Sequence, residues 1–151
     1  MTTPIKKPTL VICSSANFYQ EVVTLQVQLR KHGYKVIIPI TAERMKRKNN
    51  YTVEKSWLTN SQEYARKTGL IRAHFQKVAS GDAILVVNNE KHGVANYIGG
   101  NVLMEMALAF YHKLPIFLLN DIPGESPFKE EVLGLGSIPL HGKVENLPKQ
   151  F

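Results

Sequence analysis

The segment Gly99–Glu105 (Gly-Gly-Asn-Val-Leu-Met-Glu) carries more chemical information than any other part of the sequence. Two adjacent glycines let a backbone approach a ligand closely, and the helix expected after them presents an N-terminus that favours anions. Glu105 lies about one turn into that helix, between Met104 and Met106. A carboxylate among apolar residues costs free energy unless it has partners, and such groups are frequent at functional sites. Glu105 is therefore the first catalytic candidate, with an ordinary solvated glutamate as the alternative.

The sequence around this segment alternates between short apolar runs and stretches with helical spacing. We expect strands at 9–13, 35–39, 83–88, 115–119 and 137–140. We expect a first helix that begins within 14–17 and ends at Gly33, and further helices at 61–79, 101–112 and 126–134. The pattern predicts one α/β domain over residues 1–151, with a three-layer flavodoxin-like or Rossmann-like fold. Helices would cover both faces of a five-stranded, mostly parallel sheet.

Ligands of such sheets bind beyond the carboxyl ends of the strands, which points to 14–17 and 88–101. The polar and glycine residues there are the candidate substrate-binding residues: Ser14, Ser15, Asn17, Asn88, Lys91, Tyr97, Gly99, Gly100 and Asn101. Ser14 and Ser15 either cap the first helix or bind a sugar or phosphate. Lys91 could meet a phosphate and Tyr97 could stack on a base. A solvated loop is the alternative for both.

Charge is distributed unevenly along the chain. Nineteen Lys and Arg face twelve acids, a net charge of +7. Residues 41–77 hold nine of the basic and three of the acidic side chains, or +6. We expect 41–60 to be a mobile, partly helical excursion. The charge favours a lid that attracts a phosphorylated nucleotide over a nucleic-acid surface, because the sequence has no helix-turn-helix, zinc-finger or aromatic RNA-binding signature. A solvated basic helix is the alternative.

Several classes of protein and site are not expected. No stretch approaches the ~20 apolar residues of a membrane span, and the N-terminus lacks the apolar core of a signal peptide. Cys13 is the single cysteine, so no internal disulfide forms, and no Cys/His cluster along the chain indicates a zinc site. We expect a cytoplasmic protein with no metal and no cofactor. Asp82, just before a strand, is expected to be a structural turn residue.

Four motifs occur in an order that resembles one known family. They are Val11–Ala16, Ser80–Val87, Gly99–Ala109 and His112–Phe117. The chain resembles the nucleoside 2-deoxyribosyltransferase superfamily, which includes the 2'-deoxynucleoside 5'-monophosphate N-glycosidases. The resemblance covers roughly residues 9–20 and 70–120. It implies that the helix after the two glycines carries the family's nucleophilic glutamate.

The resemblance implies a retaining mechanism in which Glu105 attacks the anomeric carbon of a deoxyribose. The resulting glycosyl-enzyme would react with water or with a second base. The family usually carries an Asp as the acid eight residues before Asp82, and this chain has His74 there. His74 is therefore either the proton donor or a core or surface histidine, and Glu90 is another candidate acid.

The resemblance also implies a homodimer or larger homo-oligomer, and the strongly apolar stretch Val102–Phe110 is compatible with such an assembly. The nucleoside or nucleotide would be its small-molecule partner. A second function class stays open, because His74 replaces the family's acid. The chain could be a non-catalytic nucleotide-binding or sensing module of the same fold.

Overall fold

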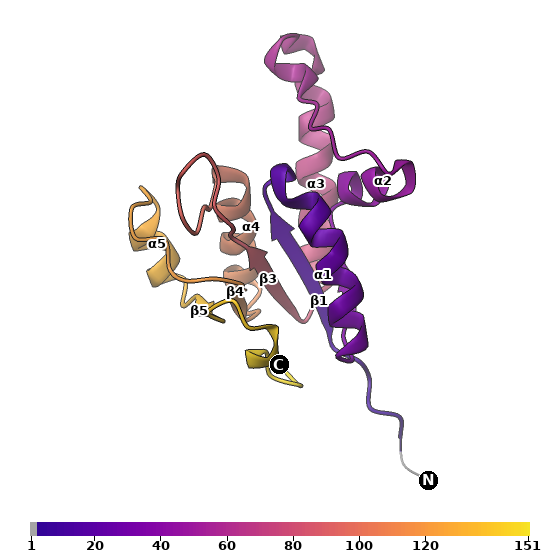
Figure 1. Ribbon diagram of the computed structural model, residues 1–151, viewed down its shortest axis with the longest axis vertical. Helices are drawn as coiled ribbons and strands as arrows, with labels where there is room; N and C mark the ends of the chain where they lie inside the picture. Colours follow the sequence, from indigo (N-terminus) through magenta and orange to yellow (C-terminus); the bar gives the residue numbers. More distant parts are fainter. Residues whose placement is uncertain (1–2) are drawn as a thin grey trace.

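Within residues 3–151, which the computed structural model describes, five parallel strands form one sheet in the order β2-β1-β3-β4-β5 (Figure 1). They are β1 (Thr9–Ser14), β2 (Lys35–Ile37), β3 (Ala83–Val87), β4 (Ile116–Leu118) and β5 (Ile138–Pro139). β1 and β3 pair in register over five residues, from Leu10 opposite Ala83 to Ser14 opposite Val87. The predicted α/β class and parallel sheet are confirmed.

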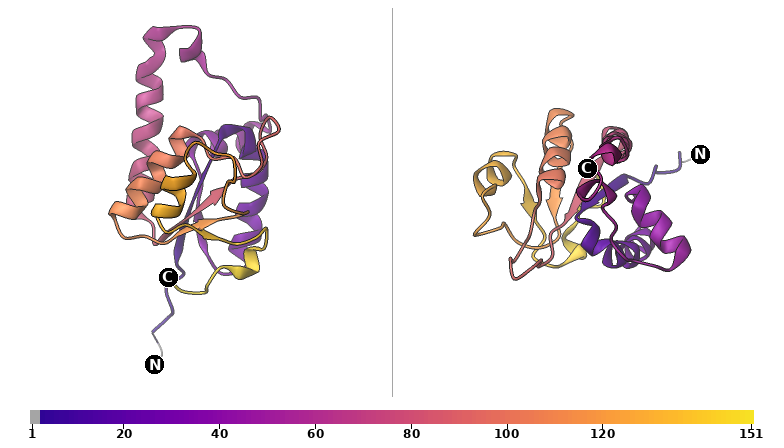
Figure 2. Two further views of the ribbon diagram at one scale, coloured as in Figure 1. Left: turned by 90° about the vertical axis from the view of Figure 1, so that its left-hand side faces the viewer. Right: turned by 90° about the horizontal axis from the view of Figure 1, so that it is seen from above.

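Helices cover both faces of this sheet, which gives three layers (Figure 2). They are α1 (Tyr19–Lys31), α2 (Ile40–Lys48), α3 (Tyr64–Ser80), α4 (Gly100–Tyr111) and α5 (Lys129–Gly134). One core cluster joins the sheet to α1, to α2 and to the C-terminal segment. The other joins the opposite face of the sheet to α3, α4 and α5. This arrangement is the Rossmann-like or flavodoxin-like three-layer architecture that the alternation predicts.

The alternation of side chains along β1 assigns one of its residues to the site. Leu10 and Ile12 pack in the cluster under α1, while Val11 and Cys13 pack in the cluster under α3 and α4. Successive side chains of a strand point to opposite faces, so the last buried residue on the α3–α4 side is Cys13. The thiol therefore faces the two helices that carry His74 and Glu105.

The excursion between β2 and α3 is partly helical, as predicted. The predicted strand 35–39 ends at Ile37, and α2 begins directly after Pro39 with Ala42 and Met45 buried. Two short 3-10 turns follow, Ser56–Leu58 and Ser61–Glu63. The N-terminal part of α3 and these turns stand beyond the carboxyl ends of the strands (Figures 1 and 2).

The start of the first helix is at the predicted place, and of the two alternatives for Ser14 and Ser15 the structure does not show the capping one. A 3-10 turn, Ala16–Phe18, precedes α1, and Ser15 at its N-cap makes no side-chain cap hydrogen bond. The Ser14 hydroxyl donates to the carbonyl of Ser15 instead, at 3.1 Å. The structural role of Asp82 is confirmed, because its carboxylate accepts the backbone N–H of Thr9 at 2.7 Å.

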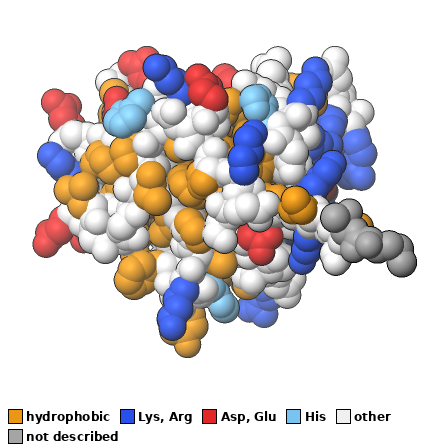
Figure 3. Space-filling model, turned by 90° about the horizontal axis from the view of Figure 1, so that it is seen from below, with side chains coloured by type: hydrophobic (Ala, Val, Ile, Leu, Met, Phe, Trp, Pro, Cys, Tyr) orange, Lys and Arg blue, Asp and Glu red, His pale blue; other side chains and the backbone are white. Residues whose placement is uncertain are grey.

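Helix α4 is buried on one face only, although its composition predicts a well-buried helix. Val102, Met106 and Ala109 lie in the core, whereas Phe110 and Tyr111 are 55% and 80% exposed. On the face opposite the excursion, Lys and Arg side chains are most frequent on the right of the view and apolar side chains on the left and in the centre (Figure 3). No helix in residues 3–151 has the length and apolar character that a membrane crossing requires.

Candidate active site

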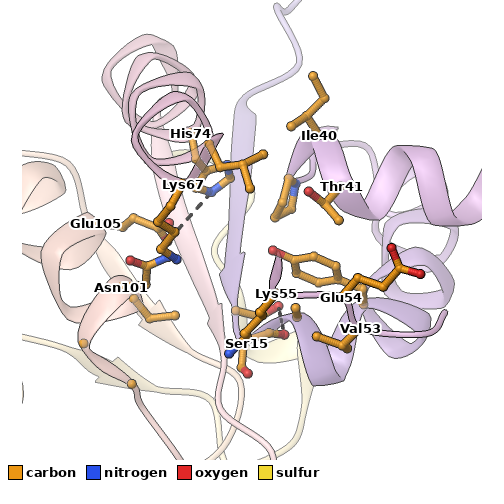
Figure 4. Close-up of a pocket in the computed structure, with 18 of the residues that line it drawn as sticks. Ser15, Ile40, Thr41, Val53, Glu54, Lys55, Lys67, His74, Asn101 and Glu105 are labelled. Atoms are coloured by element: carbon orange, nitrogen blue, oxygen red, sulfur yellow. Dashed lines mark hydrogen bonds and ion pairs between the residues drawn. The ribbon is translucent and has the colours of Figure 1, made fainter. Parts of the chain in front are cut away.

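A cavity of about 320 Å³ lies beside the carboxyl end of β1 (Figure 4). Its walls come from the loop after β1, the start of α2, residues 53–57, one face of α3, the loop after β3 and the start of α4. The basic excursion thus forms part of the wall, at the sheet edge where the sequence places a lid. The cavity is in the size range of small-ligand sites, roughly 300–1,000 Å³.

Nine of the eleven predicted site residues line this cavity. They are Ser14, Ser15, His74, Lys91, Tyr97, Gly99, Gly100, Asn101 and Glu105. At Gly100 a β-carbon would meet no atom within 4 Å, so the backbone there is open to a ligand. The two others do not line it. Asn17 is exposed, and Asn88 is buried elsewhere along the sheet edge.

Asn88 is fully buried in a hydrogen-bond network that joins the ends of β3 and β4. Its Nδ2 donates to the carbonyl of Asp121 at 2.9 Å, and its Oδ1 accepts the backbone N–H of Asn120 at 2.9 Å. The side chain of Asn120 donates in turn to the carbonyl of Asn88 and to Oδ1 of Asn89. These bonds use the amide of Asn88 for structure, which leaves it no role in the cavity.

Three buried side chains from three elements meet at the inner end of the cavity. Cys13 lies near the end of β1, His74 in the middle of α3 and Glu105 in the second turn of α4. The Cys13 Sγ lies 3.6 Å from His74 Nε2, and His74 Nε2 lies 3.9 Å from Glu105 Oε2. Three buried side-chain atoms of the described residues have no hydrogen-bond partner, and two of them, Glu105 Oε2 and His74 Nδ1, belong to this group; the third is Gln26 Oε1. A buried polar atom without a partner is rare and points to function.

Burial controls the protonation of this group. It raises the pKa of Glu105 from 4.5 to about 7, against smaller lowering effects of a hydrogen bond from Cys13 and the charge of Lys67. Burial and then the charge of Lys77 lower the pKa of His74 from 6.5 to about 4. At pH 7 His74 is therefore neutral. Its contact with Glu105 is not an ion pair.

A neutral imidazole is a weak acid, so this geometry does not favour His74 as the proton donor that the resemblance implies. Its Nε2 instead lies between the Cys13 thiol and the Glu105 carboxyl. From that position it contacts the carboxyl group without a hydrogen bond to Oε2. Glu90, the other candidate acid, is exposed and does not line the cavity.

Cationic and aromatic side chains form the outer wall. Lys91 donates to Ser15 Oγ at 3.0 Å and lies 4.8 Å from the ring centre of Tyr97. Lys67 lies 5.3 Å from the ring centre of Trp57. Burial and then the charge of Lys55 lower the pKa of both Lys67 and Lys91, so the three lysines share one positive region. That region suits an anionic ligand.

Sequence reasoning missed the other lining residues, among them Tyr19, Lys55, Trp57 and Lys67. The charge of 41–77 was a signal for the two lysines. Which of the basic residues face the cavity depends on the rotation of α3 about its axis and on the path of residues 53–57. The sequence pattern predicts neither the rotation of α3 nor the path of residues 53–57.

The same tertiary placement brings potential metal ligands together. One donor atom each from Cys13, His74 and Glu105 lie within 4.8 Å of one another. The sequence predicts no such cluster, because 61 residues separate the cysteine from the histidine. The structure shows that the fold places these three side chains together.

No protein-family model matches the chain, and a comparison with curated proteins gives no match. Function must therefore be inferred from the chemistry of the cavity.

Proposed function

We propose that the protein cleaves the N-glycosidic bond of a deoxyribonucleoside or its 5'-monophosphate, or transfers the deoxyribosyl group to a second base. The observation that carries the proposal is Glu105, a buried carboxyl with an unpartnered oxygen at a cavity with positively charged walls. Its place after Gly99 and Gly100 also matches the resemblance to the nucleoside 2-deoxyribosyltransferase superfamily.

In the first step a carboxylate oxygen of Glu105 forms a bond to C1' of the sugar, and the bond from C1' to the base nitrogen breaks. The electron pair of that bond leaves with the base, which takes up a proton. In the second step water or another base attacks C1', and the sugar–Glu105 bond breaks. A carboxylate suits both steps, since it is a nucleophile that also stabilises positive charge developing on the sugar ring.

The neighbours of Glu105 support this chemistry in different ways. His74 lies beside the carboxyl as a neutral group, and the departing base takes its proton from solvent water. Lys67 contributes positive charge that favours the ionised, nucleophilic form of Glu105. Tyr97 and Trp57 offer aromatic faces for a base, and Lys91 and Lys55 offer charge for a phosphate.

The test is to incubate the protein with deoxynucleosides and their 5'-monophosphates and to measure free base by chromatography. Base release by the wild type and its loss in Glu105→Ala and Glu105→Gln support the proposal. Glu90→Gln is the matched control, because Glu90 is an exposed glutamate outside the cavity, and it should retain activity. Release that survives Glu105→Ala refutes the mechanism.

The neutral state of His74 favours one second candidate, a non-catalytic nucleotide-binding or sensing module. In that case the cavity binds a nucleotide without turnover. Calorimetry with a deoxynucleoside monophosphate separates the two functions. Binding that persists for hours with no free base supports the module, whereas base release supports the enzyme.

The proposal includes a homo-oligomer. An apolar groove lies on the outer surface of α3 and α4, lined by Ile71 and Phe75 of α3 and by Leu108 of α4 among other residues. Phe110 and Tyr111 lie exposed on α4 as well. Light scattering coupled to size-exclusion chromatography tests this, and a monomer at micromolar concentration would contradict it.

A further inference from the structure

We propose that Cys13, His74 and Glu105 form a zinc-binding site, and that a bound zinc ion blocks the cavity's carboxyl group. The zinc-binding part of the proposal depends only on the positions of these three side chains and not on the proposed function. Its inhibitory effect rests on the proposed function of Glu105 as a nucleophile.

The donor set selects the metal. Thiolate, imidazole and carboxylate together are ligands typical of Zn²⁺, and a purely oxygen-ligated Mg²⁺ or Ca²⁺ site contains no sulfur. Sites with three protein ligands leave a fourth position for water or another ligand. Here two of the three donor residues, His74 and Glu105, line the cavity, so a ligand in that fourth position can come from it.

The distances are close to those of a tetrahedral site. With a Zn–S distance of about 2.3 Å and Zn–N and Zn–O distances of about 2.0–2.2 Å, neighbouring donors lie about 3.2–3.8 Å apart. The Cys13 Sγ to His74 Nε2 distance of 3.6 Å is within that range, and the His74 Nε2 to Glu105 Oε2 distance of 3.9 Å is just outside it. All three donor atoms lie within 4.8 Å of one another, so side-chain adjustments of up to about 1 Å bring them to the distances of a zinc site.

Burial and rigidity make the arrangement a built site. The three residues are 0%, 6% and 8% exposed, and each comes from a different core element. Glu105 Oε2, aimed at the cluster, has no other hydrogen-bond partner among the described residues. A zinc ion would give that oxygen the partner it lacks.

Zinc and a sugar would compete for the same oxygen. A carboxylate that donates its electron pair to a metal cannot also attack C1', and the ion itself occupies the inner end of the cavity. Micromolar zinc should therefore lower base release, and a chelator such as EDTA should restore it.

The first experiment uses the full-length, tag-free wild-type protein titrated with Co²⁺ as a spectroscopic substitute for zinc. Because Cys13 is the only cysteine, a thiolate-to-cobalt charge-transfer band can arise only from this site. We expect the band to saturate at one equivalent and to disappear when Zn²⁺ is added. A titration without the band refutes the site, and this result requires no variant to fold.

The second experiment compares two variants by equilibrium dialysis with Zn²⁺, after circular dichroism has confirmed their fold. Cys13→Ser keeps a small polar side chain but removes the sulfur ligand, so zinc affinity should fall at least about 10-fold. The control is His141→Ala, which removes an exposed histidine that contacts Asp121 and could bind zinc on the surface. Unchanged affinity in Cys13→Ser, or its loss in His141→Ala, overturns the proposal.

Failure of this proposal is distinguishable from failure of the proposed function. Dialysis and cobalt spectra need no substrate, so they report on the site even in a protein that releases no base. If base release occurs, the zinc concentration that halves it should be higher for Cys13→Ser than for the wild type, each measured against its own zinc-free rate. Equal inhibition of the two would refute the inhibitory role alone.

Discussion

Two polar clusters lie at the same edge of the sheet, and they differ in how their hydrogen-bonding atoms are used. Asn88 is fully buried, with its amide nitrogen and oxygen both bonded to backbone groups around Asn120 and Asp121. The cluster of Cys13, His74 and Glu105 is nearly as buried but leaves Glu105 Oε2 and His74 Nδ1 without partners. A satisfied network stabilises a fold, whereas unsatisfied buried groups cost stability and persist where function needs them.

The largest expected effect separates the two clusters by activity. Glu105→Gln should lower base release at least about 10³-fold, because it removes the nucleophile while keeping the shape of the side chain. Asn88→Ala leaves the nucleophile in place, so its folded fraction should retain activity per molecule. Steady-state kinetics on protein whose folded fraction has been measured provides the comparison. Equal losses in both variants would show that the two clusters do not differ in role.

The second prediction concerns stability, which Asn88→Ala should lower although it leaves the nucleophile in place. Asn88→Ala removes two partly buried hydrogen bonds, those to the N–H of Asn120 and the carbonyl of Asp121, and the free energy of unfolding should fall by about 3 kcal/mol. Urea unfolding measures it. The control is Asn89→Ala, which loses a single hydrogen bond from the side chain of Asn120 and should cost about 1 kcal/mol. A loss at Asn88 no larger than at Asn89 would contradict the structural role of the network.

The same contrast explains how much could be predicted from the sequence. The apolar runs 9–13 and 83–88 and the helical spacing between them encode the strands and layers, because local pattern determines burial. Glu105 was also predictable, as a carboxyl in an apolar helix after two glycines. The structural role of Asn88 was not predictable, because a polar residue just beyond a strand can either bind a ligand or form hydrogen bonds between neighbouring strand ends.

The remaining parts of the site depend on tertiary placement. Cys13 and His74 are 61 residues apart in sequence, and only the packing of α3 on the sheet brings them to 3.6 Å. The protonation state of His74 depends on its burial in that interface, and its residue type alone suggests a proton donor. Trp57 and Lys67 enter the cavity through the fold of the excursion, and a count of its charges does not reveal their orientation.

Next in size is a pH dependence that only the unsatisfied cluster should show. The pKa of Glu105 is about 7 in the folded protein and 4.5 unfolded, so ionisation is harder in the fold. The contribution of the protonated Glu105 to the free energy of unfolding is fully present below about pH 4.5, and it is lost as the pH rises through 7. Removal of the ionisable group in Glu105→Gln should therefore raise the relative free energy of unfolding between these pH values, by at most about 3 kcal/mol.

Urea unfolding from pH 5 to pH 8 in EDTA, which keeps metal away, measures this difference. His74, with its pKa lowered to about 4, makes the opposite contribution because it loses stability as the pH falls from 6.5. Both proteins carry His74, so its contribution cancels to first order. The loss of unfolding free energy in Asn88→Ala should be nearly constant over this pH range, because the asparagine side chain does not ionise. A constant difference for Glu105→Gln would show that Glu105 does not ionise within the range.

The smallest expected effect concerns the positive wall. Lys91→Gln removes one charge that also contacts Ser15 and Tyr97. An exposed charge contact is worth at most about 1 kcal/mol, so KM for a deoxynucleoside monophosphate should rise about 5-fold while kcat is retained. KM for the corresponding nucleoside should change less, because it has no phosphate to attract. Lys143→Gln, on the surface outside the cavity, is the control.

Added salt should reduce this difference, because it screens the lysine and phosphate charges in the wild type. An equal rise of KM for nucleoside and monophosphate would assign Lys91 to the loop's structure through Ser15 and Tyr97. The positive charge of the excursion would then have no part in substrate choice. The two clusters would then differ in function only through Glu105. That carboxyl has an oxygen without a hydrogen-bond partner, lies beside a neutral histidine and lines the cavity.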